Sequence, residues 1–493
     1  MAKFIMSIDQ GTTSTRTCII NQAGSRVADA QKAFPQIFPE PGWVEHDPQQ
    51  IWQTTVETME MALKNAGISG QDIAAIGITN QRETVMIWDK HSGRPIHNAI
   101  VWQCRRTSQM CQKLKQQKKD KVILKKTGLI LDPYFSATKI QWMLTNVKDA
   151  KKNALAGNLL AGTVDTFLLW NLTKGQSHKT DVSNASRTML MNIHSGDWDS
   201  ELLKIFQVPR QMLPEICESN AHFGVTKGLN FLPDGVPIHG IAGDQQAALF
   251  GQACFQVGEA KCTFGTGSFL LLNTGKKAVR SKAKILTTIA WKLKGQETVY
   301  ALEGGAFVCG AAVQWLRDGL GLIEKSSDIE KLAMTVPDTG GVEFVPALTG
   351  LGAPHWRPEA RGLMIGMTRG TTKAHIARAT LEAMALQNVD ILQAMQKDLG
   401  KKLKAVKVDG GASANNLLMQ LQADYSGVTV IRPKNLETTA MGAAYLAGLG
   451  SGFWKNLDEV KKIYHVDHEF SVNMTAKKRS ERLISWKKAV AKA

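Results

Sequence analysis

The sequence predicts an α/β fold made of two large domains. At 493 residues, the chain exceeds the size at which a single hydrophobic core stops growing. Strand-like and helix-like segments alternate in both halves, which favours α/β layers. Each half also opens with a strand, a turn of Gly, Thr and Ser residues, and a second strand. We place the boundary in the Ala- and Gly-rich stretch 242–260 and expect domains of residues 1–250 and 251–493, with a catalytic cleft between them.

The first half is expected to begin with a hairpin whose tight turn lies at residues 11–14. Asp47 and Pro48 form an N-cap and first-turn pair for a helix that ends near Gly67. The predicted strands of this region are residues 4–9, 16–21, 73–79 and 85–88.

The second half repeats the hairpin, with predicted strands at 259–264 and 269–273 around a turn at 265–268. A short helix is expected at 246–250, before this hairpin. Helical periodicity then follows at residues 306–320, 375–399 and 414–425. The similarity of the two hairpins suggests an internal repeat.

The formal net charge of +17 raises the question of a nucleic-acid or anionic-membrane partner. None of the basic clusters has the interleaved aromatic residues of a single-strand stacking platform. We therefore interpret them as solvated helix faces and termini, and expect neither nucleic acid nor membrane insertion. The clusters lie at residues 113–126, 148–152, 401–407 and 477–482.

The seven cysteines are odd in number, scattered, and never spaced as a CxxC pair. This pattern indicates neither a disulfide framework nor a zinc site, so we expect reduced thiols in a cytoplasmic protein. Residues 1–6 lead directly into a strand, which leaves no room for a signal peptide. No run of about 18 apolar residues predicts a membrane span.

The first turn is a candidate phosphate-binding site, because its backbone N–H groups and hydroxyls can bind phosphate oxygens. Asp9, at the end of the preceding strand, is suited to hold Mg²⁺, which keeps several waters and takes few carboxylates besides phosphates. The candidate phosphate ligands are Thr12, Thr13, Ser14 and Arg16. The spacing fits neither a P-loop nor a dinucleotide fingerprint, and a plain structural hairpin is the alternative.

Two further turns have related chemistry. The turn containing Thr266 could close on a triphosphate from the opposite side, although it too could be structural. In the segment 408–416, two glycines stand between a strand and a helix. Gly411 would let a flat base or ribose approach the backbone, and Asn415 could hydrogen-bond it.

Two longer patterns extend these observations. They are the run from Tyr134 to Asn146 (YFSATKIQWMLTN), and GLMIG at 362–366 running on to His375 and Glu382. With the three turns, they make the sequence resemble the FGGY carbohydrate kinases. The resemblance implies two domains with the actin, hexokinase and Hsp70 ATPase (ribonuclease H-like) fold, which close on ATP, Mg²⁺ and substrate.

Within that family, the segment 80–84 (NQRET) resembles members that phosphorylate glycerol. The resemblance implies that its Arg and Glu hydrogen-bond glycerol hydroxyls, and a site of matched polar partners rejects analogues that leave them unpaired. The implied substrate-binding residues are Arg82, Glu83, Trp102, Tyr134, Asp244, Gln245 and Phe269. For Arg82 and Glu83 alone, the alternative is a surface ion pair of little energetic value.

Asp244 is expected to act as the general base for the attacking hydroxyl and, with Asp9, to hold Mg²⁺. A helix-capping aspartate is the alternative for this position. The implied nucleotide contacts are Thr266, Gly310, Gln314, Gly411 and Asn415. The implied reaction is ATP-dependent phosphorylation of glycerol to sn-glycerol 3-phosphate, in glycerol catabolism and glycerolipid precursor supply, by a homodimer or homotetramer.

Three other functions remain open from the sequence. A kinase of xylulose or another polyol would use the same phosphate turns with a different pocket. An ATP-driven binding protein like actin or Hsp70 would hydrolyse ATP slowly and without a polyol. A nucleic-acid-binding protein would use the basic clusters.

Overall fold

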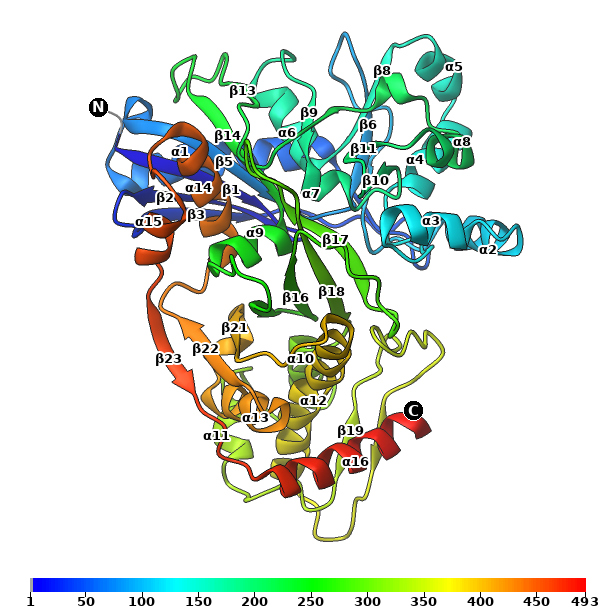
Figure 1. Cartoon of the computed structure of the whole chain (residues 1–493), viewed down its shortest axis with the longest axis vertical. Helices are drawn as coiled ribbons and strands as arrows, with labels where there is room; N and C mark the ends of the chain where they lie inside the picture. The colour runs from blue at the N-terminus through cyan, green and yellow to red at the C-terminus, as the bar shows by residue number, and fades with distance from the viewer. Residues whose placement is uncertain (1–2) are drawn as a thin grey trace.

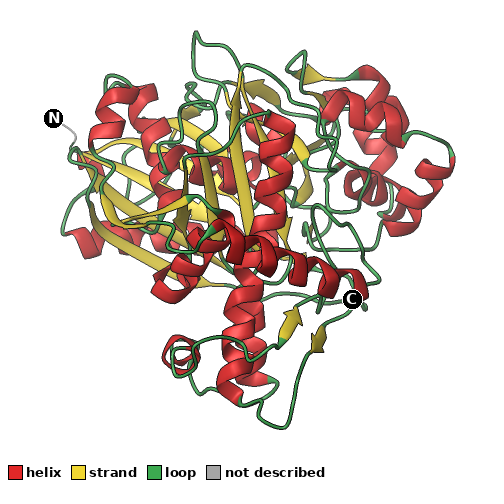
Figure 2. Ribbon diagram, turned by 60° about the horizontal axis from the view of Figure 1, so that its bottom comes forward, coloured by secondary structure: helices red, strands yellow, loops and turns green. Residues whose placement is uncertain are grey.

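The computed structural model describes residues 3–493. Met1 and Ala2, which belong to the segment predicted to lack a signal peptide, lie outside the described residues. Figure 1 shows the N-terminal half at the top of the molecule and most of the C-terminal half below it. Figure 2 shows strands gathered between helices, as expected for α/β layers.

The first large sheet has six strands and contains the predicted N-terminal hairpin. Its strands, in spatial order, are β13 (Gly224–Val225), β14 (Pro237–Gly243), β5 (Ile73–Asn80), β1 (Phe4–Gln10), β2 (Ser14–Asn21) and β3 (Arg26–Ala33). β1 pairs antiparallel with β2 and parallel with β5. In this register Asp9 lies beside Arg16 on one side and Thr79 on the other.

The second large sheet has seven strands. In order, they are β17 (Leu286–Trp291), β18 (Val299–Ala306), β16 (Ser268–Gly275), β15 (Ala260–Phe264), β21 (Ala405–Asp409), β22 (Thr429–Pro433) and β23 (Val466–Phe470). β15 pairs antiparallel with β16 and parallel with β21, which repeats the pairing of β1 with β2 and β5. The suggested internal repeat is therefore present in the topology.

A smaller four-stranded sheet and several helices extend the N-terminal half, at the upper right of Figure 1. The sheet contains β4 (Glu45–His46), β7 (Ala99–Ile100), β6 (Val85–Asp89) and β8 (Leu159–Thr163). The helices of this half include α1 (Pro48–Ala66), α2 (Ser108–Gln116), α3 (Asp120–Thr127), α4 (Ala137–Asn146), α5 (Ala150–Leu155), α6 (Val164–Leu172), α7 (Val182–Ala185) and α8 (Ser200–Phe206). Short strand pairs are β9 (Lys179–Asp181) with β12 (Glu215–Cys217), and β10 (Met191–Asn192) with β11 (Asp197–Trp198).

The predicted first helix is confirmed as α1 (Pro48–Ala66). The Asp47 carboxylate accepts a hydrogen bond from the Gln49 N–H at 2.8 Å, and Gly67 ends the helix in the left-handed conformation with φ 65°. The later helices are α9 (Asp244–Gly251), α10 (Gly310–Asp318), α11 (Asp328–Ala333), α12 (Lys373–Leu399), α13 (Asn416–Ser426), α14 (Thr438–Ser451), α15 (Leu457–Lys462) and α16 (Ala476–Lys492). One more strand pair, β19 (Glu343–Val345) with β20 (Leu363–Ile365), lies in the C-terminal half.

Two helices begin later than predicted, whereas α9 and α12 each begin two residues earlier than predicted, at Asp244 and Lys373. The helix expected from residue 306 begins at Gly310, because β18 pairs with β16 as far as Ala306. The helix expected from residue 414 begins at Asn416, because residues 411–414 form a 3₁₀ turn. In both places a short turn separates the strand from the helix, and periodicity alone does not resolve it.

The cysteines, the apolar helices and the basic clusters bear on what the composition predicts. All seven cysteines are free and buried. Within residues 3–493, no helix combines the length and the apolar character needed to cross a bilayer. Most side chains of the four basic clusters are exposed. The domain boundary near residue 251 stays a prediction.

Candidate active site

The segment after β5 carries Arg82 and Glu83 into the interior. Both residues are almost fully buried, at 2% and 1% exposure, so the surface ion-pair alternative is wrong. Glu83 has a left-handed backbone with φ 61°, a conformation that costs a non-glycine residue free energy and recurs at functional sites. Their positions are therefore held by the surrounding contacts and not by local preference.

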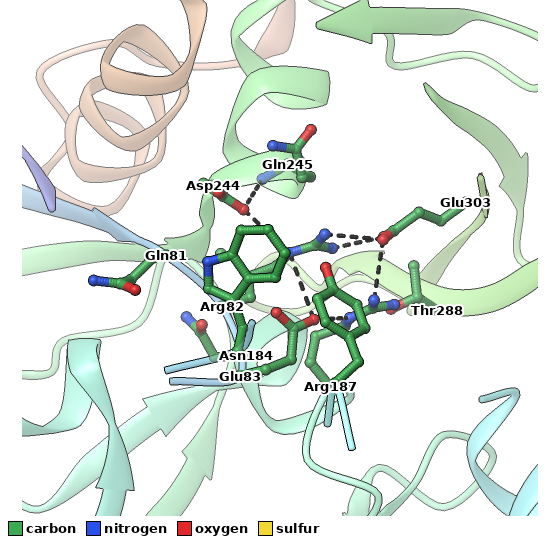
Figure 3. Close-up of polar contacts among 12 residues, drawn as sticks. Gln81, Arg82, Glu83, Asn184, Arg187, Asp244, Gln245, Thr288 and Glu303 are labelled. Carbon is green, nitrogen blue, oxygen red and sulfur yellow. Dashed lines mark hydrogen bonds and ion pairs between the residues drawn. The ribbon is translucent and has the colours of Figure 1, made fainter. Parts of the chain in front are cut away.

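Those contacts form a buried ion network with Arg187 and Glu303 (Figure 3). Arg82 binds Glu303 in bidentate fashion, Nη1 to Oε2 at 2.6 Å and Nη2 to Oε1 at 2.9 Å. Arg187 donates from Nε to Glu83 Oε1 at 2.7 Å and from Nη2 to Glu303 Oε1 at 3.0 Å. Two arginines thus join two carboxylates from opposite halves of the chain.

Burial and charge act in opposite directions on these carboxyl groups. Burial alone would raise the pKa of Glu303, but Arg187 and Arg82 outweigh it and lower the pKa to about 2. Burial raises the pKa of Glu83 despite the attraction of Arg82 and Arg187. Glu303 is therefore the firmly ionised member of the pair.

Asp244 is the first residue of α9, directly after β14. Its Oδ1 lies 3.1 Å from Arg82 Nε, and its side chain is 30% exposed. The helix N-terminus favours its negative charge. Asp244 is not the N-cap, because Gly243 occupies that position. The carboxylate is left partly open beside the network.

Gln245 is oriented by a lysine from the second large sheet. The fully buried Lys261 contacts Gln245 Oε1 through Nζ and donates to Thr263 Oγ1 at 2.8 Å. Burial lowers the pKa of Lys261. Nζ thus fixes the amide oxygen, and since the amide NH₂ of Gln245 has no hydrogen-bond partner among residues 3–493, it can donate to a substrate.

The predicted aromatic residues lie beside the network. The Trp102 ring packs edge-on against Tyr134, with centroids 5.5 Å apart, and the indole Nε1 donates to Thr12 Oγ1 at 2.9 Å. This contact links the polar site to the first phosphate turn. Phe269 pairs with Gly305 across β16 and β18, so its side chain lies on the same sheet face as Glu303.

The first turn is closed by a hydrogen bond from the Gly11 N–H to the Ser14 carbonyl at 2.9 Å. Thr13 is exposed there, and Ser14 is half-buried. Arg16 is not free for phosphate, because it is ion-paired with Glu437 and donates to Gln31 Oε1 at 2.6 Å. Burial, followed by the negative charge of Asp244, raises the pKa of Asp9 to about 7.

The second and third turns lie against each other. The Thr266 carbonyl accepts hydrogen bonds from the N–H groups of Cys309 and Ala311, at 2.8 and 3.1 Å, which places the turn at the start of α10 with Gly310 and Gln314. A Cβ at Gly410 would lie 2.6 Å from the Phe264 carbonyl, so only glycine lets the turns approach this closely. Asn415 caps α13 through Oδ1, leaving its Nδ2 free.

These residues fit a magnesium nucleotide. A Cβ at Gly411 would meet nothing within 4 Å, which leaves open space for a flat group beside the third turn. Asp9 and Asp244 are oxygen donors that repel each other, and a hard cation would relieve the repulsion that raises the Asp9 pKa. No cluster of three or more acidic, His or Cys side chains suited to a metal occurs in residues 3–493. A bound Mg²⁺ would therefore depend on phosphate oxygens as well.

The structure thus brings the polar and aromatic residues predicted to bind substrate into one region, and joins the second and third turns into another. No hydrogen bond or ion pair in the described part of the chain joins the first turn directly to the second, and Arg16 is paired with Glu437. Sequence reasoning missed Arg187, Glu303 and Lys261. For Glu303 and Lys261 a signal existed, since each is a charge within an apolar strand.

Comparisons with known proteins show the family to which the chain belongs. Residues 4–251 match the family model of the FGGY family of carbohydrate kinases, N-terminal domain, and residues 260–451 match its C-terminal domain. A glycerol kinase of Bdellovibrio bacteriovorus is 72% identical over 490 residues, covering 99% of both chains. A glycerol kinase of Caldanaerobacter subterraneus subsp. tengcongensis is 55% identical over 493 residues, covering 100% of this chain and 99% of its own.

Among solved structures, glycerol kinase of Plasmodium falciparum with ADP superposes with a TM-score of 0.93. It is 39% identical and covers 99% of this chain and 98% of its own. The predicted fold class, two domains of the actin and hexokinase ATPase type, is confirmed by these matches.

Proposed function

Because the chain belongs to the FGGY family of carbohydrate kinases, we propose that it transfers the γ-phosphoryl group of ATP to glycerol, yielding sn-glycerol 3-phosphate for glycerol catabolism and glycerolipid synthesis. The relatives that match over nearly the whole chain carry this activity in their names. The enzyme uses ATP with Mg²⁺. The structural observation that carries the proposal is the partly open Asp244 carboxylate, 3.1 Å from Arg82 and beside the buried polar network.

In the proposed mechanism, Asp244 accepts the proton of the attacking glycerol hydroxyl. Arg82 Nε is buried, and apart from its ion pair with Asp244 Oδ1 at 3.1 Å it makes no hydrogen bond in the described structure, so a glycerol oxygen can accept from it. Glu83 accepts from another hydroxyl, and the Gln245 amide donates to glycerol. Trp102 and Phe269 cover the carbon chain, with Tyr134 as a further polar contact.

The remaining assignments concern the nucleotide. Bound Mg²⁺ supplies neutralisation of phosphate charge during transfer. We propose Asp9 and Asp244 as its protein ligands, and phosphate contacts from the first and second turns. The proposed nucleotide contacts are Thr12, Thr13, Ser14, Arg16, Thr266, Gly310, Gln314, Gly411 and Asn415. For Arg16, binding requires release from Glu437.

We also propose a domain boundary near residue 251, a cytoplasmic location and a homodimeric or homotetrameric state. The boundary is supported by the end of α9 at Gly251 and the start of the second sheet at Ala260. The seven free thiols suit a reducing compartment. Size-exclusion chromatography with light scattering measures the oligomeric state.

The function is tested by measuring ADP release from purified protein with Mg-ATP. We expect strong stimulation by glycerol, weaker stimulation by dihydroxyacetone, and little by xylulose or by buffer alone, because the network matches a hydroxyl on every carbon. Faster turnover with xylulose would reassign the substrate. Turnover that does not respond to any polyol would instead indicate an ATP-driven binding protein.

The raised pKa of Asp9 predicts a pH dependence. In the absence of nucleotide, a carboxyl whose folded pKa is about 7 stabilises the protein most below its unfolded pKa of 3.8, and this stability is lost as pH rises to 7. Asp9→Asn removes the penalty of ionisation, so its melting temperature relative to the unsubstituted protein should increase between pH 5 and 8. Thermal unfolding across this range measures the difference.

With Mg-ATP bound, we expect the pH dependence of stability to have the opposite sign, because binding should require the ionised Asp9 carboxylate. Stabilisation by Mg-ATP should grow from pH 6 to 8 in the unsubstituted protein and be nearly constant with pH in Asp9→Asn. Asp29→Asn, an exchange on β3 of the same sheet, serves as a control. Equal pH dependence in all three proteins would contradict the role of Asp9.

A further inference from the structure

We propose that Glu303 is a positioning residue for substrate recognition, which fixes Arg82 and Arg187 from the second sheet so that the glycerol site has one defined geometry. The inference depends on the proposed function, since it concerns the same site. Glu303 comes from β18, whereas Arg82, Glu83, Arg187 and Asp244 all precede the second sheet in the chain. The C-terminal half would thus complete a substrate site that the N-terminal half carries.

The geometry of Glu303 is that of a fixed anchor. Its two oxygens accept all three charge-assisted hydrogen bonds, two from Arg82 and one from Arg187, at 2.6 to 3.0 Å. Bidentate pairing of a guanidinium with a carboxylate fixes the plane of the guanidinium as well as its position. With both Nη atoms of Arg82 held in this way, its Nε remains as the donor directed toward Asp244 and the substrate.

The alternative partner of Arg82 is the proposed base itself. Asp244 is partly exposed and only 3.1 Å from Arg82 Nε. Without the Glu303 charge, both Nη groups would be buried donors without a charged acceptor, and turning toward Asp244 would satisfy them. Such a pairing would occupy the carboxylate that must accept the glycerol proton. Glu303 therefore limits the contact between the arginine and the base to the single Nε–Oδ1 pair, because it holds both Nη groups.

The strand that carries Glu303 is itself anchored to the N-terminal half. Tyr300 donates from its hydroxyl to the Ile193 carbonyl at 2.8 Å, and on β17 the Thr288 hydroxyl lies 3.0 Å from that of Ser186. Gln246, on α9, donates to the Ile289 carbonyl at 3.1 Å and accepts from Arg82 Nη1, also at 3.1 Å. These contacts hold β17 and β18 at the glycerol site.

The test is the steady-state kinetics of Glu303→Gln, which keeps the shape but removes the charge. We expect the glycerol KM to rise about 30-fold or more, as for loss of one partner of a buried charge pair, with a lower kcat. The Mg-ATP KM should stay within about threefold, because the turns that we assign to the nucleotide do not touch Glu303. The ratio of kcat/KM for glycerol to that for 1,2-propanediol should fall about tenfold.

Glu303→Asp keeps the charge but withdraws it by one methylene, so it should recover part of the glycerol KM. If Glu303→Gln does not fold, Glu303→Asp is used for the same kinetic measurements. ADP binding measured by calorimetry shows whether each variant is folded. Glu382→Gln is the matched control, because Glu382 is buried on α12 and paired with Arg378 of the same helix and with Arg482 of α16, away from the site. Its glycerol KM should not change.

Two results would overturn the inference. One is an unchanged glycerol KM in both Glu303 variants. The other is a fall in kcat alone with both KM values and the glycerol preference intact, as expected if Glu303 only stabilises the fold. Absence of glycerol-dependent turnover in the unsubstituted enzyme would instead reject the proposed function.

Discussion

Asp244→Asn is expected to lower kcat for glycerol phosphorylation by roughly 10² to 10⁴-fold, the usual contribution of a general base. The amide has nearly the shape of the carboxylate but cannot accept the proton of the attacking hydroxyl. Its oxygen can still accept the hydrogen bond from the Gln245 N–H, which is 2.7 Å long in the structure. The start of α9 should therefore remain intact, and ADP release with saturating glycerol and Mg-ATP measures the loss.

The control separates chemistry from folding. Asp338→Asn changes another carboxylate that accepts a single backbone hydrogen bond, from the Gly340 N–H at 2.8 Å, away from the site. Its kcat should equal that of the unsubstituted enzyme. Calorimetric binding of ADP without Mg²⁺ should be retained in Asp244→Asn. A kcat within tenfold of normal would mean that another group, or water, accepts the proton.

The parts of the site that could be predicted from the sequence are those encoded by local segments. The turn after Asp9, the turn containing Thr266 and the Gly410 turn each lie between two elements whose periodicity is clear. Glycine and small hydroxyl residues in such a turn have few uses besides tight reversal and anion binding. Local chemistry therefore predicted both the hairpins and their candidate function.

The ion network could not be predicted in this way. Arg82 and Glu303 are 221 positions apart, and Arg187 and Glu83 are 104 apart. Their pairing depends on how β17 and β18 pack against the N-terminal half, which no local pattern describes. For the same reason, Arg16 appeared available for phosphate, although in the structure it is paired with Glu437 at the N-cap of α14.

The placement of α14 is the long-range feature with the largest expected effect on stability. This helix follows the second sheet in the chain but packs against β1, β5 and β14 of the first sheet, and against α9. In Figure 1 it lies among the N-terminal strands. Its sequence is nearly all small or apolar, so periodicity indicated no preferred face. Small residues allow the close approach, as at Gly77, where a Cβ would lie 2.3 Å from the Ala443 carbonyl.

Gly442→Ala is therefore expected to destabilise the protein by about 3 kcal/mol or more, the range of severe overpacking. A Cβ at this position would lie 1.8 Å from the Ala247 carbonyl oxygen and 2.5 Å from its carbonyl carbon. Both atoms belong to the backbone of α9 and cannot rotate away as a side chain would. Urea unfolding followed by circular dichroism measures the loss of free energy.

The sign of the change in stability on Gly442→Ala tests the backbone contact between α14 and α9. In an exposed helix interior, Gly→Ala stabilises by about 1 kcal/mol, because alanine has the higher helix propensity. Ser451→Ala, in the last turn of α14, changes a partly exposed side chain and should alter stability by no more than about 0.5 kcal/mol. Stabilisation by Gly442→Ala would show that α14 and α9 are not in backbone contact. Destabilisation with a lower kcat would show that this contact also holds Asp244, since a shift of α9 moves its first residue relative to Arg82.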